Sequence, residues 1–358
     1  MTVGQAVPVP LTVQVNDAAG NPVAGATVEF TVDPAAGQLG TPSALTGADG
    51  RAATAFTVLA SGDVQVTAAV AGTSLATTFT ETGLTAFAIE LQFLTAPSPA
   101  QRQAFVLAQQ RWQRIIVGDL PAVQLNAAAG KCGANSPAVN RSIDDLLILI
   151  TLEPIDGNGG VLGAAGPCFV RTGTRLPVMG SMKFDTADLN LLEQNNLLQP
   201  VILHEMGHVL GFGTIWSDLN LLSGPALSGG NDPHFTGPAA IAAFDQVGGS
   251  SYAGGAKVPV EDTGGEGTAD AHWRETVFGT ELMTGFVDQN PDPLSIVSIA
   301  SMGDLGYTVN QAEADPFSLA TALRALARGP RFSLGNDRLR LALHVVAADG
   351  RVVEVVQP

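Results

Sequence analysis

The chain of 358 residues is poor in cysteine, in charged residues and in long apolar runs. Its two cysteines exclude a small disulfide scaffold. Charged residues make up 14 % of the chain, below the usual share of about a quarter. Because 17 basic residues face 33 acidic ones, the formal charge is −16 and a basic surface is missing. We therefore expect no nucleic-acid partner and no anionic membrane surface as the main partner.

No apolar run approaches the ~20 residues that a helix needs to cross a bilayer, so we expect no transmembrane segment. The densest run, Leu146–Ile150, has the length of a strand. The first residues show neither the basic region nor the apolar stretch of an export signal, as expected for a mature or trimmed chain. Cys132 and Cys168 could form one bridge in an exported protein, and two buried free thiols are the alternative.

Length and composition indicate a multidomain protein that is rich in turns. A chain of 358 residues exceeds one typical domain, and 41 glycines and 22 prolines favour turns over helical bundles. We divide it into residues 1–83, residues 84–310 and residues 311–358. The last part is predicted to hold a helix and a β-hairpin, a C-terminal tail to which no role can be assigned.

Residues 1–83 show the period-two alternation of β-strands, for example in Leu11–Val15 and Thr27–Val32. Short strands at even spacing predict an all-β sandwich. The stretches "DAAGNPVAGATVEFTV" and "TGADGRAATAFTV" resemble bacterial immunoglobulin-like domains of the invasin and intimin type. No titratable cluster occurs here. We expect a spacer or adhesion module that could contact a cell-surface or extracellular partner.

Residues 84–310 mix strand and helix patterns and predict an α+β domain. One helix is expected to begin at Pro99, because Ser98 is a suitable N-cap and Gln101 completes a capping box. A second helix is expected to run from Pro200 to just before Gly211.

The second helix carries the motif HExxH, formed by His204, Glu205 and His208. Residues i and i+4 lie on one helix face, so the two imidazoles can hold one Zn²⁺ ion. Glu205 can then accept a proton from a water at the metal. A buried structural histidine pair is the alternative, but two histidines and a glutamate are costly to bury without a use.

Zinc needs a third protein ligand, and the residues alone leave it open. The plain metzincin spacing, HExxHxxGxxH, would place a histidine at position 214, which is Thr214. The other candidates downstream are Asp218, His234, Glu261, His272 and His344.

Three separated stretches resemble the leishmanolysin-like metzincin peptidases, especially their bacterial members. These stretches are "HEMGHVLGFGTIW", "ADAHWRETVFGTELMTG" and "PLSIVSIASMGDLGY". The resemblance spans most of residues 84–310 and implies that an insertion separates the helix from the third ligand. It implies an α+β metzincin catalytic domain that binds one Zn²⁺ per chain. The implied ligands are His204, His208 and His272, with Glu205 as general base and Met283 in the Met-turn beneath the metal.

The resemblance also implies a cleft in which an edge strand pairs with an extended peptide, and Val178–Phe184 is our candidate strand. Metzincin zymogens often hold a propeptide cysteine on zinc, but residues 1–83 contain no cysteine, so we expect no latency device.

The sequence thus predicts a zinc-dependent endopeptidase, extracellular or at the cell surface, that hydrolyses protein or peptide substrates. The main alternative is a surface adhesion or spacer protein with a catalytically weak zincin scaffold. A zinc hydrolase acting on another substrate class is a further alternative.

Overall fold

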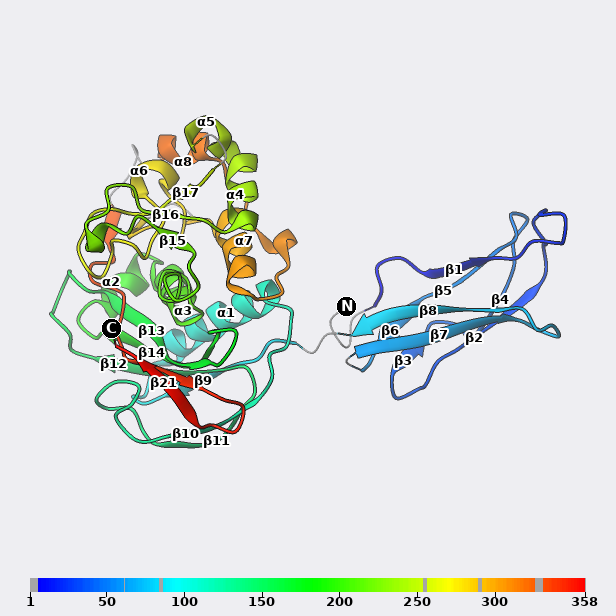
Figure 1. Cartoon of the computed structure of the whole chain (residues 1–358), viewed down its shortest axis with the longest axis horizontal. Helices are drawn as coiled ribbons and strands as arrows, with labels where there is room; N and C mark the ends of the chain where they lie inside the picture. Colours follow the sequence, from blue (N-terminus) through cyan, green and yellow to red (C-terminus); the bar gives the residue numbers. More distant parts are fainter. Residues whose placement is uncertain are drawn as a thin grey trace. The chain divides into compact units, whose positions relative to one another are not determined.

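The computed structural model describes residues 6–60, 62–83, 86–253, 256–288, 292–325 and 331–357. The chain forms two compact units, Met1–Ala86 with Val117–Asp119, and Phe87–Ile116 with Leu120–Pro358 (Figure 1). Residue 84, where the second domain was expected to begin, lies outside the described residues. The domain limits at residues 83 and 310 stay predictions.

The N-terminal unit is all-β, as predicted. Its strands are β1 (Leu11–Gln14), β2 (Thr27–Thr31), β3 (Gly37–Leu39), β4 (Ser43–Leu45), β5 (Arg51–Thr54), β6 (Phe56–Val58), β7 (Gly62–Val70) and β8 (Ala76–Gly83). They form an antiparallel sheet of order β4-β2-β7-β8 and the pairs β1-β5 and β3-β6. Alternation places Val28, Phe30, Val64 and Val66 inside, since one face of each sheet packs on the core.

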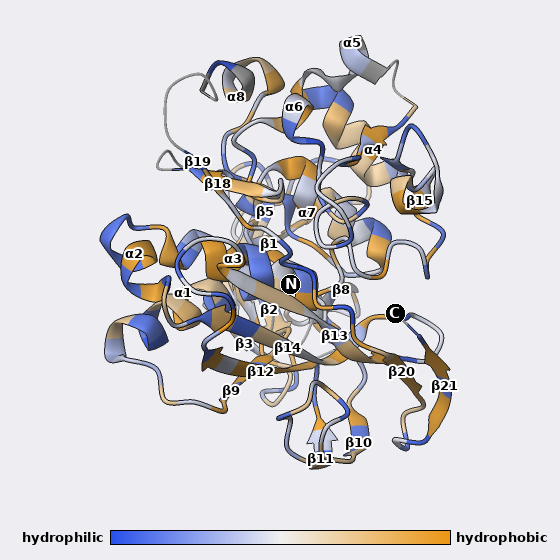
Figure 2. Cartoon of the chain, turned by 90° about the vertical axis from the view of Figure 1, so that its left-hand side faces the viewer, coloured by the Kyte–Doolittle hydropathy of each residue, from blue (hydrophilic) through white to orange (hydrophobic). Residues whose placement is uncertain are grey.

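A six-stranded mixed sheet organises the second unit, in the order β21-β20-β13-β14-β12-β9. The strands are β9 (Ile89–Phe93), β12 (Leu146–Glu153), β13 (Gly163–Arg171), β14 (Pro177–Asp185), β20 (Leu343–Val346) and β21 (Val352–Val356). β9, β12 and β14 run parallel, and β13 is antiparallel to β14. Hydrophobic residues follow β20 and β21 along most of their length (Figure 2). The expectation that Val178–Phe184 is an edge strand was wrong, because β14 has a partner on each side.

Two long helices, α1 (Pro99–Ile115) and α3 (Leu198–Val209), pack against each other beside this sheet. The capping box of α1 is confirmed: the Ser98 side chain accepts from the Gln101 backbone N–H, and the Gln101 side chain accepts from the Ser98 N–H. α3 begins two residues earlier than expected. The hairpin of β10 (Val123–Ala127) and β11 (Val139–Ile143) shares a second apolar cluster with the sheet.

The remaining elements lie on the far side of α3 from the sheet (Figure 1). They are α4 (Pro238–Phe244), α5 (Ser250–Ala253), α6 (Glu275–Phe278), α7 (Ile296–Leu305), α8 (Leu319–Ala325), β15 (Leu222–Ser223), β16 (His234–Phe235), β17 (Val258–Pro259), β18 (Phe286–Asp288) and β19 (Arg331–Ser333). A short helix, α2 (Leu189–Gln194), precedes α3. Together with the sheet they give the second unit its α+β character, as predicted.

The C-terminal segment is built into the second unit. β20 runs parallel to β13 and forms an antiparallel hairpin with β21. Among the described residues, no helix combines the length and the apolarity required to cross a membrane.

Candidate active site

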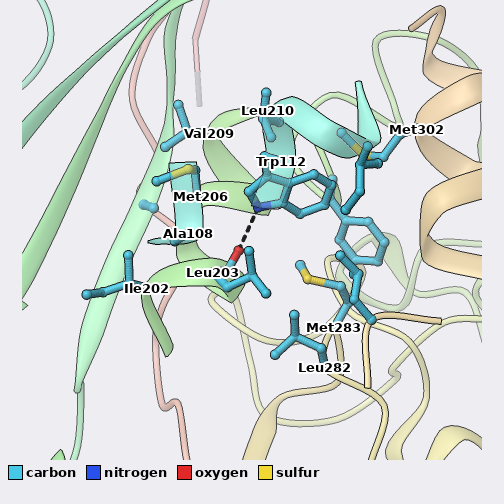
Figure 3. Close-up of a cluster of buried hydrophobic side chains, with 14 of the residues drawn as sticks. Ala108, Trp112, Ile202, Leu203, Met206, Val209, Leu210, Leu282, Met283 and Met302 are labelled. Atoms are coloured by element: carbon cyan, nitrogen blue, oxygen red, sulfur yellow. Dashed lines mark hydrogen bonds between the residues drawn. The ribbon is translucent and has the colours of Figure 1, made fainter. Parts of the chain in front are cut away.

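Helix α3 supplies His204, Glu205 and His208 from its last two turns. The helix is anchored by apolar neighbours such as Ile202, Met206 and Val209, and all of these side chains are buried (Figure 3). The Trp112 indole of α1 donates a hydrogen bond of 2.9 Å to the Leu203 carbonyl. Packing on both sides therefore fixes the helix, and with it the direction of the three polar side chains.

The chain leaves α3 through two glycines with positive φ, Gly211 (112°) and Gly213 (69°). A Cβ atom on Gly213 would collide with the Ala271 backbone, so glycine is what lets this turn approach the loop of His272. Thr214 donates its hydroxyl to the His208 carbonyl at 2.8 Å. The residue at the plain metzincin position thus stabilises the end of the helix.

The loop before His272 is held by buried carboxylates. Asp270 has a positive φ of 65° and accepts from the backbone N–H groups of Ala226 and Leu227. The Glu261 N–H donates to the His272 carbonyl at 2.9 Å. The Glu261 carboxylate accepts from the Glu275 N–H at 3.0 Å. These bonds join three separate stretches of chain and set the position of His272.

The three histidines point their Nε2 atoms at one another. The Nε2–Nε2 distances are 2.9 Å for His204–His208, 3.0 Å for His208–His272 and 3.2 Å for His204–His272. Each Nδ1 lies 2.7–2.9 Å from a backbone carbonyl, those of Leu282, Phe212 and Thr268. A carbonyl only accepts, so each Nδ1 carries a proton, and in the neutral ring each Nε2 then presents a lone pair.

A metal ion fits this donor set. Three lone pairs in mutual contact repel unless a cation lies between them. Tetrahedral Zn²⁺ with bonds of about 2.0–2.1 Å would space its nitrogen ligands by about 3.3 Å, close to the observed spacing. Burial lowers the pKa of His204, and burial with the two neighbouring histidines lowers that of His208 further. Both rings are therefore neutral, as metal ligation requires.

Glu205 lies beside this cluster and is fully buried. Neither carboxylate oxygen has a hydrogen-bond partner among the described residues. Burial, and then the charge of Asp337, raises the pKa of Glu205 well above its usual value. A buried carboxylate without partners is costly, so Glu205 is a candidate for a chemical role.

Asp337 is a fourth member of the cluster and was not predicted from the sequence. Its Oδ2 atom lies 3.0 Å from His272 Nε2, 3.3 Å from His204 Nε2 and 3.9 Å from His208 Nε2. Burial opposes its ionisation, but His272 and His204 outweigh burial and hold its pKa well below the usual range. In turn Asp337 overcomes the effect of burial on His272, whose pKa is raised.

Met283 lies next to Leu282 and below Trp112 (Figure 3), and its side chain packs against Gly207 of α3. Its N–H donates to the Glu281 carboxylate at 2.6 Å, and its carbonyl accepts from the Trp273 N–H at 3.0 Å. The fully buried Glu281 also accepts from the Ser298 hydroxyl at 2.5 Å. The Glu281 carboxylate, which the sequence did not single out, therefore fixes the turn at Met283. The Leu282 carbonyl, one residue before Met283, orients His204.

The other candidate ligands lie outside the cluster. His234 is in β16, and its Nδ1 bonds to the Asp232 carbonyl. His344 is in the six-stranded sheet and stacks on Phe169. Asp218 lines a separate cavity of about 190 Å³ beside Arg338. Glu261 is occupied by backbone donors in its own loop, as described above.

Cys132 and Cys168 are joined by a disulfide. It ties the loop between β10 and β11 to β13, on the face of the sheet away from α3.

The comparison with known families agrees with this arrangement. Residues 128–324, more than half of the chain, match the family model described as leishmanolysin. The chain belongs to the leishmanolysin family. It is a family of metallopeptidases, and the described helix, loop and turn all lie within the matched residues. Residues 6–82 match the bacterial Ig-like domain (group 1), so the N-terminal sandwich is an immunoglobulin-like domain.

Individual relatives match over short stretches. A leishmanolysin-like peptidase of Drosophila pseudoobscura pseudoobscura is 42% identical over 65 residues, which cover 18% of this chain and 9% of that protein. This chain thus spans less than a tenth of that relative. A C-terminal 282-residue fragment of intimin, solved with the intimin-binding domain of its translocated receptor, is 25% identical, with 21% of this chain and 26% of that chain covered and a TM-score of 0.19. The D0-D1 domain of intimin is 26% identical, with 21% and 36% covered and the same TM-score of 0.19.

Proposed function

We propose that the chain is a zinc-dependent endopeptidase that hydrolyses peptide bonds of protein substrates. The observation that carries this proposal is the convergence of three histidine Nε2 atoms beside a buried carboxylate without partners. His204, His208 and His272 would hold the ion, one per chain, and Met283 would pack below it. Membership of a metallopeptidase family supports the same reading.

Zinc bound there would supply a Lewis acid for the scissile carbonyl and lower the pKa of water in the site. Glu205 accepts a proton from the attacking water and returns it to the leaving amine nitrogen. Burial raises the pKa of Glu205, and a carboxylate of higher proton affinity is a better acceptor for the proton of the attacking water. The backbone carbonyls behind the three histidines keep the rings oriented during this exchange.

Casein hydrolysis by the zinc-loaded chain tests the proposal. We expect cleavage that a chelator abolishes and zinc restores, and that the Glu205→Ala chain lacks although it still binds one zinc ion. A chain that binds zinc and cleaves no protein in any form would favour the alternative, an adhesion or spacer protein with a catalytically weak zincin scaffold.

The immunoglobulin-like domain gives that alternative its basis, and also suggests where the enzyme acts. We propose that it spaces the peptidase domain from a cell surface, or binds a surface or extracellular partner, in an exported bacterial protein. To measure this role, the purified Glu205→Ala chain is added to intact cells and the bound amount is determined. The same amount is determined on cells that were first incubated with residues 1–86.

A further inference from the structure

A C-terminal segment, residues 333–341, lies across the candidate site, and we call it the strap. The Ala165 N–H donates to the Asp337 carbonyl at 2.7 Å, and the Leu339 N–H donates to the Ala165 carbonyl at 2.8 Å. The strap therefore pairs in parallel with the start of β13, next to where β20 pairs further along. It occupies the sheet edge at which an extended peptide could add as a strand.

Small residues of β13 make room for the strap. This part of β13 reads Gly163-Ala164-Ala165-Gly166. A Cβ atom on Gly166 would lie 2.6 Å from the Leu339 carbonyl oxygen, and one on Gly163 would lie 3.3 Å from Cγ of Glu205. Gly166 thus lies against the strap, and Gly163, three residues earlier, lies against the proposed general base Glu205. The strap therefore runs beside the proposed reacting centre.

The loop that carries His272 holds the strap from the other side. The Thr268 hydroxyl donates to the Gly335 carbonyl at 2.8 Å, and Arg340 forms an ion pair of 2.7 Å with Glu266. Asn336 packs so closely on Gly267 that a Cβ atom there would collide with it. The strap is therefore clasped between β13 and the His272 loop.

The strap presents a carboxylate to the histidines. Asp337 is fully buried, and its Oδ1 atom has no hydrogen-bond partner among the described residues. Three imidazoles and one carboxylate make the complete donor set of a closed tetrahedral site, whereas a catalytic zinc site keeps its fourth position open. The Asp337 carbonyl accepts from the Ala165 N–H of β13, so the peptide bond that follows Asp337 is paired with the sheet.

We propose that Asp337 is a displaceable fourth metal ligand and that the strap competes with an extended substrate for the site, so that the wild type is partly latent and cleaves casein more slowly than a chain whose strap is released. This proposal rests on the proposed function, because it assigns regulation to the same metal and cleft. The sequence analysis predicted no latency device, because it considered only a cysteine as the blocking zinc ligand and residues 1–83 contain none. Besides Asp337, the strap is held by two backbone bonds to β13, the Thr268 bond, a bond from the Leu334 N–H to the Gly285 carbonyl, a 3.4 Å bond from Arg338 to the Thr214 carbonyl and a partly exposed ion pair. In this proposal, release of the strap breaks these contacts and leaves the pairing of β20 with β13 intact.

The test uses the full chain loaded with Co²⁺, whose visible absorption reports its ligands. Asp337→Asn keeps the shape of the side chain and removes the charge. Asp349→Asn is the matched control, because Asp349 caps the exposed turn between β20 and β21 through a 3.0 Å bond from the Arg351 N–H. We expect Asp337→Asn to change the spectrum, to weaken Co²⁺ affinity by about tenfold or more and to bind a peptide hydroxamate at least about tenfold more tightly. Asp349→Asn should match the wild type.

An unchanged spectrum and Co²⁺ affinity in Asp337→Asn would overturn the fourth ligand. A changed spectrum with unchanged hydroxamate affinity would make Asp337 a permanent structural ligand and overturn the latency. If Asp337→Asn does not fold, Leu339→Pro decides, because it removes the N–H donor to Ala165 and keeps Asp337; hydroxamate affinity equal to that of the wild type would then count against the strap.

Hydrolysis keeps the two proposals apart. Tighter hydroxamate binding without cleavage of any protein would mean that the strap proposal stands and the peptidase function fails. Full casein hydrolysis by the wild type, with no gain in Asp337→Asn, would mean the reverse.

Discussion

Met283 packs against Gly207 at a distance that leaves no space for a side chain on the helix. A Cβ atom on Gly207 would lie 2.9 Å from Cε and 3.2 Å from Sδ of Met283. Glycine in a helix interior costs about 1 kcal/mol relative to alanine. The residue before His208 therefore gives up helix stability, and in return the turn that orients His204 comes into contact with α3.

Gly207→Ala is expected to lower the free energy of unfolding by about 1–3 kcal/mol, because the methyl group overpacks against Met283 and Trp112. Gly303→Ala in α7 is the matched control, since its Cβ would meet only Val309 Cγ2 at 3.4 Å. That variant should be neutral or more stable by up to about 1 kcal/mol. Urea unfolding of both variants measures the difference, and equal stabilities would refute the close packing.

Glu205→Ala is expected to lower kcat/KM for peptide hydrolysis by about 10²–10⁴-fold, the usual worth of a general base. Zinc content should stay at one ion per chain, because the residue is not a ligand in our assignment. Each rate is compared with that of its parent in both the wild-type and the Asp337→Asn chain, so that latency cannot hide the effect. A variant as active as its parent would remove Glu205 from the mechanism.

His272→Ala is expected to weaken zinc affinity by at least about tenfold, because it deletes one of three converging nitrogens. His234→Ala serves as the control, because His234 bonds the Asp232 carbonyl away from the cluster. Competition with a chromogenic chelator gives both affinities. Loss of zinc in His234→Ala and not in His272→Ala would reverse the assignment of the third ligand.

Removal of metal is expected to lower the thermal midpoint of the second unit. A ligand that binds only the folded state adds RT ln(1 + [L]/Kd) to its stability, about 2.7 kcal/mol at a hundredfold excess over Kd. The relief of repulsion among the three Nε2 lone pairs belongs to this gain. Calorimetry with and without chelator measures the shift, and an unchanged midpoint at saturating zinc would argue against a site formed only on folding.

Asp292 should make the chain less stable as pH rises. Burial, and then the charge of Asp288, raises the pKa of Asp292 from 3.8 to about 8. Between these values the unfolded chain has lost the proton and the folded chain keeps it, so the free energy of unfolding falls with increasing pH. Asp292→Asn should therefore gain stability relative to the wild type, by more than about 1 kcal/mol between about pH 5 and pH 8. Urea titrations beside Asp349→Asn measure this, and a difference independent of pH would contradict it.

The sequence identified those parts of the site that are local. His204, Glu205 and His208 follow from the geometry of one helix, and the capping box of α1 follows from four consecutive residues. His272 and Met283 have no periodic relation to that helix, and they could be singled out only through a family resemblance. The structure brings the former into the same cluster and the latter beneath it.

The parts that sequence reasoning missed depend on non-local pairing. Asp337 is 65 residues from His272 and reaches it only because the strap pairs with β13. β13 itself contains glycines, alanines and a proline, which give a weak strand pattern. When β13 is not recognised as a strand, β14 has a partner on one side only and is predicted to be an edge strand. Glu281 sits one residue before the Leu282 carbonyl that it helps to place, and nothing in its own neighbourhood marks it as buried.

Main-chain carbonyl oxygens orient all three histidine rings, and they belong to Leu282, Phe212 and Thr268. A carbonyl oxygen is identical in every amino acid. The side chains at these three positions can therefore drift over evolutionary time without loss of ring orientation, provided that the loops keep their course. Mutational scanning would accordingly register positions 212 and 282 as sites of packing and position 268 as a contact of the strap. It would overlook that the backbone of each position orients a proposed metal ligand.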